Sequence, residues 1–254
     1  MPPYDDGMDP LITSSGNPLI KRFKKLHRTR GRRETHQTII EGRTVLALAL
    51  TAGVGPVSVV ALEDDTATID EARERGFPIA LVSEDVLRST ADTQHPQSPV
   101  AMIDIPATPL LRRRDTLVLC DISDPGNVGT MIRSAAAFGW DVCVSGSTAD
   151  VWSPKVLRAG VGCHFGVHIS HSDDPIADVA SLGLESVAAV VSDGGDPLRG
   201  ERSVALLIGS ESRGLSDEET ARADRTVTIS TPGQVESLNA AVAASLLMYS
   251  FLPS

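Results

Sequence analysis

The sequence VALLIGSESRGL, residues 204–215, joins five apolar residues to a polar turn that contains two glycines. The apolar run does not alternate with polar residues, so it predicts a strand buried on both faces of a parallel sheet between helices. Ligands of such sheets bind beyond the carboxyl ends of the strands. Gly209 lets the backbone approach a ligand closely, and Glu211 could orient that ligand.

A simpler interpretation of this turn is an acidic entry into the next helix. Ser216 would cap that helix, and Glu219 would complete a capping box. This interpretation accounts for Ser216 but not for the glycines on either side of Glu211.

Strands and helices alternate on both sides of this stretch and predict an α/β fold with a parallel sheet. In the second half the expected strands are 116–121, 141–145, 166–170, 186–192, 204–209 and 226–230, and the expected helices are 128–138, 154–161, 175–181, 217–223 and 238–251. In the first half a basic helix follows Asn17, with strands at 57–62, 79–82 and 100–105 and helices at 43–51, 66–75 and 84–89.

Composition changes along the chain predict the domain boundaries. Residues 1–12 lack periodicity and are expected to form a disordered tail, and residues 13–105 form a smaller α/β domain. Two prolines and a charge run mark 106–115 as a linker. Residues 116–254 then form the larger domain.

A second polar block, NVGTMIR at residues 127–133, follows a predicted strand and opens a helix. A glycine-rich turn in that place usually binds phosphate or a nucleotide. The block is neither a dinucleotide-binding fingerprint nor a P-loop, because the ribose-binding acid and the Gly-Lys-Ser/Thr sequence are absent. Arg133 lies on an otherwise apolar helix, so its partner is either a phosphate of a bound polynucleotide or a carboxylate in a surface ion pair.

A third block, SLNAAVA at residues 237–243, opens the last helix. Ser237 is the expected N-cap of that helix. The helix is apolar nearly all round, which predicts burial on more than one side, as a subunit interface would provide.

Charge is distributed unevenly over the 254 residues. The net charge is −10, yet residues 17–44 carry nine Lys or Arg against two acids, which is a local net charge of +7. A basic stripe on an acidic body is compatible both with contact to RNA phosphates and with a merely solvated helix face, and the charge pattern alone leaves both open. The candidate RNA-binding residues are Lys21, Arg22, Lys24, Lys25, Arg28, Arg30, Arg32 and Arg33.

Several classes of protein are disfavoured. No apolar run approaches the roughly 18 residues that a bilayer span needs, and the acidic N-terminus does not resemble a secretory signal, so a cytoplasmic protein is expected. The three cysteines fit no zinc spacing and are expected to be buried free thiols. His164, His168 and His171 have no acidic partner in sequence, so no metal site is predicted.

Taken in order, the three blocks resemble the motifs of the SpoU (TrmH-like) family of SPOUT methyltransferases. The matches are N-x-G-x-x-x-R at residues 127–133, G-x-E-x-x-G-L at 209–215 and S-L-N-x-x-x-A at 237–243. The stretches 153–159 and 232–236 also look like family sequence. The first half, with Asn17-Pro18, the basic run and residues 40–42, more loosely resembles the ribosomal-protein-like substrate domain that is often fused to these enzymes.

The resemblance implies a trefoil-knotted catalytic domain, a homodimer, and methylation of a ribose 2′-hydroxyl in RNA with S-adenosylmethionine. It implies that Gly209, Ile229 and Leu238 line the cofactor pocket. It also implies that Arg133, Asn127, Glu211, Ser237 and Asn239 form the catalytic site.

Arginine is a poor base, because its pKa exceeds about 12. We therefore expect Arg133 to anchor a phosphate and stabilise the emerging alkoxide, with Ser237 or an RNA phosphate relaying the proton. Large-subunit (23S) rRNA is the favoured substrate, because the fused domain is common among rRNA-directed members. Some relatives of this layout confer antibiotic resistance, which these residues do not decide. The alternatives are a tRNA methyltransferase, a non-catalytic RNA-binding protein on the same fold, and an enzyme acting on a protein or a small molecule.

Overall fold

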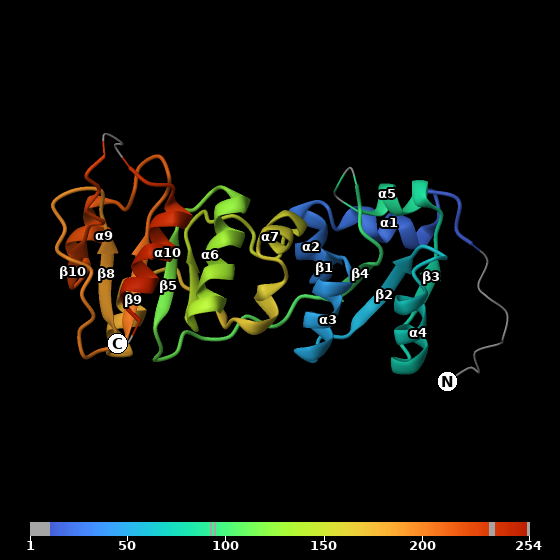
Figure 1. Ribbon diagram of the computed structural model, residues 1–254, viewed down its shortest axis with the longest axis horizontal. Helices are drawn as coiled ribbons and strands as arrows, with labels where there is room; N and C mark the ends of the chain where they lie inside the picture. The colour runs from blue at the N-terminus through green and yellow to red at the C-terminus, as the bar shows by residue number, and fades with distance from the viewer. Residues whose placement is uncertain (1–10, 92, 94, 234–236, 253–254) are drawn as a thin grey trace. The chain divides into compact units, whose positions relative to one another are not determined.

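A computed structural model describes residues 11–252 except 92, 94 and 234–236. The chain forms two compact units (Figure 1). The first comprises residues up to Pro106 together with Trp152–Pro154, and the second comprises Ala107–Val151 and Lys155–Ser254. The proposed tail lies outside the described residues up to position 10, but Ile12 is ordered, because it pairs with Val82 in a parallel bridge.

The first unit is built on a four-stranded mixed sheet in the order β1-β4-β2-β3. Only β2 and β3 run parallel to each other. Its elements are α1 (Pro18–Lys25), α2 (Thr29–Thr35), β1 (Gln37–Glu41), α3 (Arg43–Thr51), β2 (Pro56–Ala61), α4 (Thr66–Arg75), β3 (Ile79–Leu81), α5 (Glu84–Thr90) and β4 (Val100–Asp104). Helices α1 and α5 share a core with the sheet through Ile20, Phe23, Val86 and Leu87.

Two features of the first unit differ from the sequence prediction. The basic stretch forms two helices rather than one, because Arg28 has extended backbone angles (φ −97°, ψ 137°) between α1 and α2. Strand β1 was not predicted. It is short, and its buried residues Thr38, Ile39 and Ile40 are consecutive, so it has no period-two pattern.

The second unit is built on a six-stranded sheet in the order β10-β8-β9-β5-β6-β7, with every pairing parallel. Its elements are β5 (Thr116–Cys120), α6 (Pro125–Phe138), β6 (Asp141–Ser145), α7 (Pro154–Ala159), the 3-10 turn η1 (Cys163–Gly166), β7 (Ile169–His171), α8 (Pro175–Ser181), β8 (Glu185–Ala189), β9 (Val204–Ile208), α9 (Asp217–Arg222), β10 (Arg225–Val227) and α10 (Ala240–Ser250). The predicted α/β fold with a parallel sheet is confirmed for this unit.

Helices cover both faces of this sheet. Residues of β5 alternate between two cores: Leu117 and Leu119 pack with α6 and α10, whereas Val118 and Cys120 pack with α8. Burial on both faces explains why the strands are continuous apolar runs. Cys120 and Cys143 are buried free thiols, as expected, and burial raises the pKa of Cys143 to about 11. Cys163 is free but only half-buried.

Predicted boundaries in the second unit differ from the observed ones by at most three residues. Helix α6 starts at Pro125 rather than 128, because Asp124 caps it by accepting from the Asn127 amide (2.8 Å). The strand expected from 166 begins only at Ile169, because residues 163–166 form the turn η1. The predicted capping box of Ser216 and Glu219 is confirmed.

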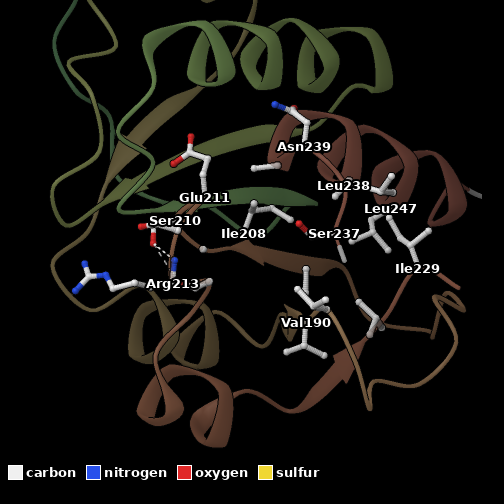
Figure 2. A pocket seen from close by; sticks show the side chains of 18 of the residues that line it. Val190, Ile208, Ser210, Glu211, Arg213, Ile229, Ser237, Leu238, Asn239 and Leu247 are labelled. Carbon is white, nitrogen blue, oxygen red and sulfur yellow. Dashed lines mark hydrogen bonds between the residues drawn. The ribbon is translucent and has the colours of Figure 1, made fainter. Parts of the chain in front are cut away.

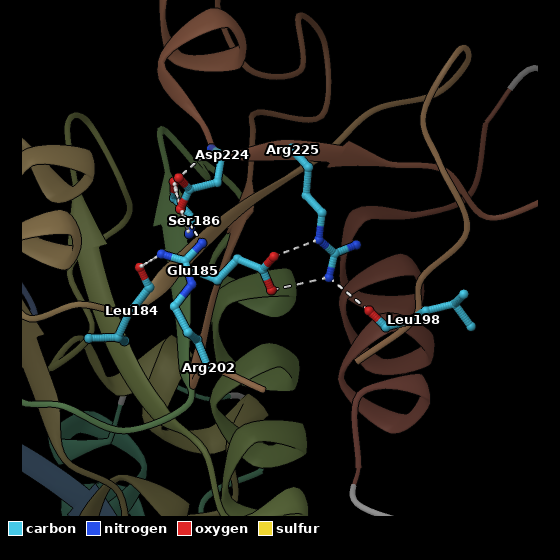
Figure 3. Close-up of polar contacts among 7 residues, drawn as sticks. All are labelled: Leu184, Glu185, Ser186, Leu198, Arg202, Asp224 and Arg225. Atoms are coloured by element: carbon cyan, nitrogen blue, oxygen red, sulfur yellow. Dashed lines mark hydrogen bonds and ion pairs between the residues drawn. The ribbon is translucent and has the colours of Figure 1, made fainter. Parts of the chain in front are cut away.

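A hydrogen bond to Leu198 and an ion pair of Arg202 with Asp224 (3.4 Å) hold the last part of the long connection between β8 and β9 (Figure 3). Arg225 donates to Glu185 (3.1 Å) and to the carbonyl of Leu198 (2.8 Å). Asp224 accepts from the amide and hydroxyl of Ser186. The connection therefore has a fixed end at the amino edge of the sheet, while its first residues lie at the opposite edge, where the cavity described next is found.

Candidate active site

A cavity of about 600 Å³ lies at the carboxyl ends of β8, β9 and β10 (Figure 2). This is the edge at which the sequence predicted a ligand site. Six of the eight predicted catalytic and cofactor residues line it: Gly209, Glu211, Ile229, Ser237, Leu238 and Asn239. The apolar part of the lining also includes Val190, Val191, Ile208, Ala243 and Leu247, which the sequence reasoning did not single out.

Gly209 is needed where β9 turns into the cavity wall. A Cβ at this position would lie 2.1 Å from the backbone carbon of Gly214 and from the amide nitrogen of Leu215. The intervening residues form a tight loop, closed by a hydrogen bond from the Gly214 amide to the Ser210 carbonyl (2.8 Å). Gly214 itself has φ +68°, a conformation that favours glycine. Both glycines around Glu211 are thus explained by the loop that presents the carboxylate.

The three sequence blocks meet through their polar side chains. The side-chain amide of Asn127 donates to the Glu211 carboxylate (2.8 Å), and the Asn239 amide donates to the Asn127 carbonyl oxygen (3.0 Å). Asn239 in turn accepts from the backbone amides of Ala241 and Val242. Figure 2 shows Glu211 pointing toward α6, from which Asn127 extends, whereas the Arg213 guanidinium points away from Leu238. Residues more than 80 positions apart are therefore held in one directed chain of hydrogen bonds.

Ser237 does not cap the last helix as the sequence suggested. Helix α10 begins at Ala240 and its N-cap is Asn239, so the prediction of Ser237 as N-cap is wrong. Ser237 is exposed and lines the cavity, which leaves its hydroxyl available to a ligand. Residues 234–236, part of the stretch 232–236, lie outside the described residues.

Arg133 is the predicted site residue that neither lines the cavity nor joins the hydrogen-bonded chain. It follows Asn127 by six residues, which is about 9 Å along the helix and roughly 120° around it. It is exposed, does not line the cavity, and forms no ion pair with any described residue. The interpretation of Arg133 as half of a surface ion pair is therefore not supported by the described side chains.

Gly129 serves packing rather than ligand binding. A Cβ there would lie 2.5 Å from the Ala159 Cβ and 2.6 Å from the Val156 carbonyl oxygen, so only glycine lets α6 approach α7 this closely. The Asn127 amide at the start of α6 is already bonded to Asp124. Packing against α7 therefore accounts for Gly129, and phosphate binding at this turn stays a prediction.

His164 lies below this contact in the core. It is 2% exposed, and burial lowers its pKa to about 4. Its ring fills the space beside Gly160, where a Cβ would lie 2.7 Å from the His164 Cε1 atom. No group of three or more His, Cys, Asp or Glu side chains in the part of the chain that the structure describes is arranged to hold a metal ion.

Comparison with known protein families shows to which family the chain with this site belongs. The model of the SpoU rRNA Methylase family matches residues 115–249, which include all three blocks. The chain belongs to the SpoU rRNA methylase family. A second family model, the MRM3-like substrate binding domain, matches residues 17–101 of this SpoU-family chain.

Individual relatives agree over almost the full length. The chain is 32% identical to the 23S rRNA (guanosine(2553)-2′-O)-methyltransferase RlmP of Bacillus subtilis, over 94% of this chain and 97% of the relative. It is 30% identical to the 23S rRNA (uridine(2479)-2′-O)-methyltransferase of Streptomyces viridochromogenes, over 93% and 90%. The AdoMet-bound rRNA methyltransferase from Sinorhizobium meliloti superposes with a TM-score of 0.86 at 26% identity, covering 95% of this chain and 97% of that one.

In this SpoU-family chain the predicted RNA-binding residues lie on the first unit. Six of them are exposed and Lys24 is half-buried. Arg32 is the exception, because it is only 3% exposed and donates to the carbonyls of Leu26 and His27. Arg32 is therefore corrected from an RNA contact to a structural residue. Within residues 11–252, apart from the five undescribed internal positions, no helix combines the length and apolar character needed to cross a bilayer.

Proposed function

We propose that this SpoU-family chain transfers the methyl group of S-adenosylmethionine to a ribose 2′-hydroxyl of RNA, with 23S rRNA as the favoured substrate. The observation that carries the proposal is the hydrogen-bonded chain Asn239–Asn127–Glu211, which joins all three family motifs beside one cavity. The names of the RlmP and Streptomyces relatives support the substrate class. They specify a guanosine and a uridine, so they do not indicate one nucleotide for this chain. An rRNA substrate favours the cytoplasm as the place of action.

The cavity suits S-adenosylmethionine. Its volume lies within the range of roughly 300–1,000 Å³ that is usual for small-molecule sites. Ile208, Ile229, Leu238 and Leu247 would cover the apolar surface of the cofactor, while the close approach of the backbone at Gly209 leaves no side chain in its way. Bound there, the cofactor supplies a methyl group on a positively charged sulfur, which is already a good electrophile.

The protein then has to position the ribose and remove a proton from its hydroxyl. Glu211 and Asn239 line the cavity, and Asn127 bonds to both, so these hydrogen bonds fix the orientations of the two side-chain amides. Such preorganised dipoles need no reorientation during the reaction. Ser237, exposed at the same cavity, is the side chain placed to hand the proton onward, directly or to an RNA phosphate.

Arg133 takes part from the open face of α6. Thr130, Arg133 and Ala137 recur at a spacing of three and four residues and are all exposed, so they form one stripe on this helix. We place Arg133 against an RNA phosphate, where it also stabilises negative charge that develops on the ribose oxygen. An arginine without a carboxylate partner among the described residues is suited to this task.

A homodimer is part of the proposal. One face of α10 is buried through Ala241, Ala244, Leu247 and Met248, but the other leaves Val242 48%, Leu246 47% and Tyr249 66% exposed. A second copy would cover this apolar stripe and bring its own α6 and α10 beside the open face that carries Arg133.

A trefoil knot is also proposed. The chain leaves the edge strand β10 and returns toward the middle of the sheet, where α10 packs in the same core as α6 and β9. This return path supports threading of the C-terminal segment through an earlier loop, contrary to the usual avoidance of threaded connections.

The test is to incubate the purified chain with labelled S-adenosylmethionine and total RNA, and to map the modified ribose by primer extension at low nucleotide concentration. Label in large-subunit rRNA at a 2′-hydroxyl supports the proposal, and label in tRNA replaces its substrate. Arg133→Ala is expected to lose methyl transfer while still binding the cofactor in calorimetry. Full turnover by that variant would refute the role of Arg133, and absence of cofactor binding by the unaltered chain would favour a non-catalytic RNA-binding protein.

A further inference from the structure

The corner between α1 and α2 is held together by a close backbone contact and by one buried arginine. Gly31 is buried, and a Cβ there would lie 2.0 Å from the carbonyl oxygen of Lys25, so only glycine lets α2 close onto the end of α1. Buried Arg32 fastens the corner from inside by donating to the carbonyls of Leu26 (2.8 Å) and His27 (3.1 Å) and to the Thr29 hydroxyl (3.1 Å).

The outer side of this corner is a groove of about 470 Å³. It is lined by Lys24, Lys25, Arg28, Arg30, Gly31 and Glu34. Four cations therefore face one carboxylate in a recess that has a fixed shape.

Glu34 divides these cations into two pairs. It accepts from Lys25 (2.8 Å) and from Arg30 (2.7 Å), and these partners hold the pKa of Glu34 below its ordinary value. Lys24 and Arg28 make no ion pair with any residue that the structure describes. Two cations are therefore occupied at rest and two are open to an anion.

We infer that this corner groove is the docking site for the RNA backbone, in which Lys24 and Arg28 contact phosphates and Glu34 restrains Lys25 and Arg30. The inference rests on the proposed function, since it takes RNA to be the substrate. RNA suits the groove because its phosphates are spaced, repeated anions that several cations can contact together. Glu34 limits the non-specific part of this attraction, because its charge offsets part of the positive field.

The first test neutralises the open pair. The double variant Lys24→Gln/Arg28→Gln and the unaltered chain are titrated with a short fluorescent single-stranded RNA of mixed sequence over a series of salt concentrations. Each lost phosphate contact lowers the slope of log K against log salt by about 0.7 for single strands, so the double variant should lose about 1.4. Its affinity at low salt should fall roughly tenfold or more.

The matched control is Arg73→Gln/Arg75→Gln, which removes the same charge from α4 of the same unit. These arginines pair with Asp70 and Glu71, and neutralising them should leave the slope unchanged. Cofactor binding by calorimetry and the circular dichroism spectrum verify that each variant is folded.

The second test is a gain of affinity. Glu34→Gln should bind RNA several-fold more tightly with a steeper salt slope, because Lys25 and Arg30 are released. A purely structural role of Glu34 predicts no gain. An unchanged slope in Lys24→Gln/Arg28→Gln, or no tightening in a folded Glu34→Gln chain, would overturn the docking site. Failure of the proposed function is a separate result, in which the unaltered chain transfers no label from S-adenosylmethionine to any RNA although its RNA-binding slope is measured.

Discussion

Asn127 and Glu211, 84 residues apart in sequence, are joined by a hydrogen bond of 2.8 Å from an amide to a carboxylate. The direction of this bond is fixed, because the carbonyl oxygen of the same Asn127 side chain accepts from Asn239. The amide can therefore be replaced by a carboxylate of almost the same shape to test charge alone.

Asn127→Asp should place two carboxylates against each other and leave the pair short of a donor. A hydrogen bond to a charged group contributes about 1.5–3 kcal/mol, so methyl transfer should fall roughly ten- to a hundredfold at neutral pH. Like charges raise the pKa of one carboxyl, so activity of this variant should partly recover as pH falls, because the protonated member becomes a donor again. Rate against pH for Asn127→Asp and Asn127→Ala is the measurement. An alanine variant that shows the same recovery would contradict the explanation.

Gly209→Ala should close the cavity without altering its chemistry. The added Cβ would meet the backbone at 2.1 Å, so the loop 210–215 would have to move. Overpacking of this kind costs about 1–3 kcal/mol, and cofactor affinity in calorimetry should fall by roughly tenfold or more. Gly166→Ala is the control in the same unit, because nothing lies within 4 Å of a Cβ at that position. Equal cofactor affinity in the two variants would show that the close backbone approach at Gly209 is not needed for the cofactor cavity.

Gly129→Ala should lower stability rather than cofactor binding. The new methyl group would press on Ala159 and on the Val156 carbonyl in a contact between helices. The free energy of unfolding should fall by about 1–3 kcal/mol, seen as a lower midpoint in urea. Thr130→Ala, at the next and exposed position of α6, should leave the midpoint nearly unchanged.

Gly129 and Glu211 show which parts of the fold and the site the sequence alone predicts and which parts it does not. Continuous apolar strands followed by glycine predicted the parallel sheet and the edge at which polar residues gather, because burial and strand direction are local consequences of composition. Which glycine contacts a ligand and which packs a helix was not predictable, because Val156 and Ala159 reach Gly129 only through the tertiary fold.

Asn239 and Arg32 are two further residues whose structural roles could not be predicted from the sequence. Ser237 and Asn239 are both good N-cap residues, and their order along the chain gives no reason to choose the later one. Arg32 has the same residue type as its exposed neighbours, but the break between α1 and α2 turns it inward. Which residue of a charged stretch is buried depends on the turn between the helices, and hydrophobic periodicity does not reveal that turn.

His164 should make stability depend on pH. Burial lowers its folded pKa to about 4, below the ordinary 6.5, so the unfolded chain binds this proton more tightly than the folded chain. Stability from this group is complete above pH 6.5 and is lost as pH falls toward 4, by about 3 kcal/mol in all. His164→Gln should flatten the dependence of unfolding free energy on pH in that window. The control His171→Gln changes an exposed residue, so its unfolding free energy should depend on pH as in the unaltered chain. An equal pH dependence in the unaltered chain, His164→Gln and His171→Gln would refute the role of His164.

The exposed stripe of α10 should hold two copies together. Leu246 is 47% exposed between Val242 and Tyr249 on a helix whose opposite face is buried. Leu246→Glu would place a charge in the proposed apolar interface, where an unpaired carboxylate is strongly disfavoured. Light scattering coupled to gel filtration should give a dimer for the unaltered chain and a monomer for Leu246→Glu.

Leu198→Glu is the control, because Leu198 is 70% exposed in the same unit but lies on the connection between β8 and β9. A monomeric unaltered chain, or a dimer that both substitutions leave intact, would exclude the α10 stripe as the interface. If the interface is correct, Leu246→Glu should also lose methyl transfer while retaining RNA binding by the first unit, because the charged corner of α1 and α2 does not depend on α10.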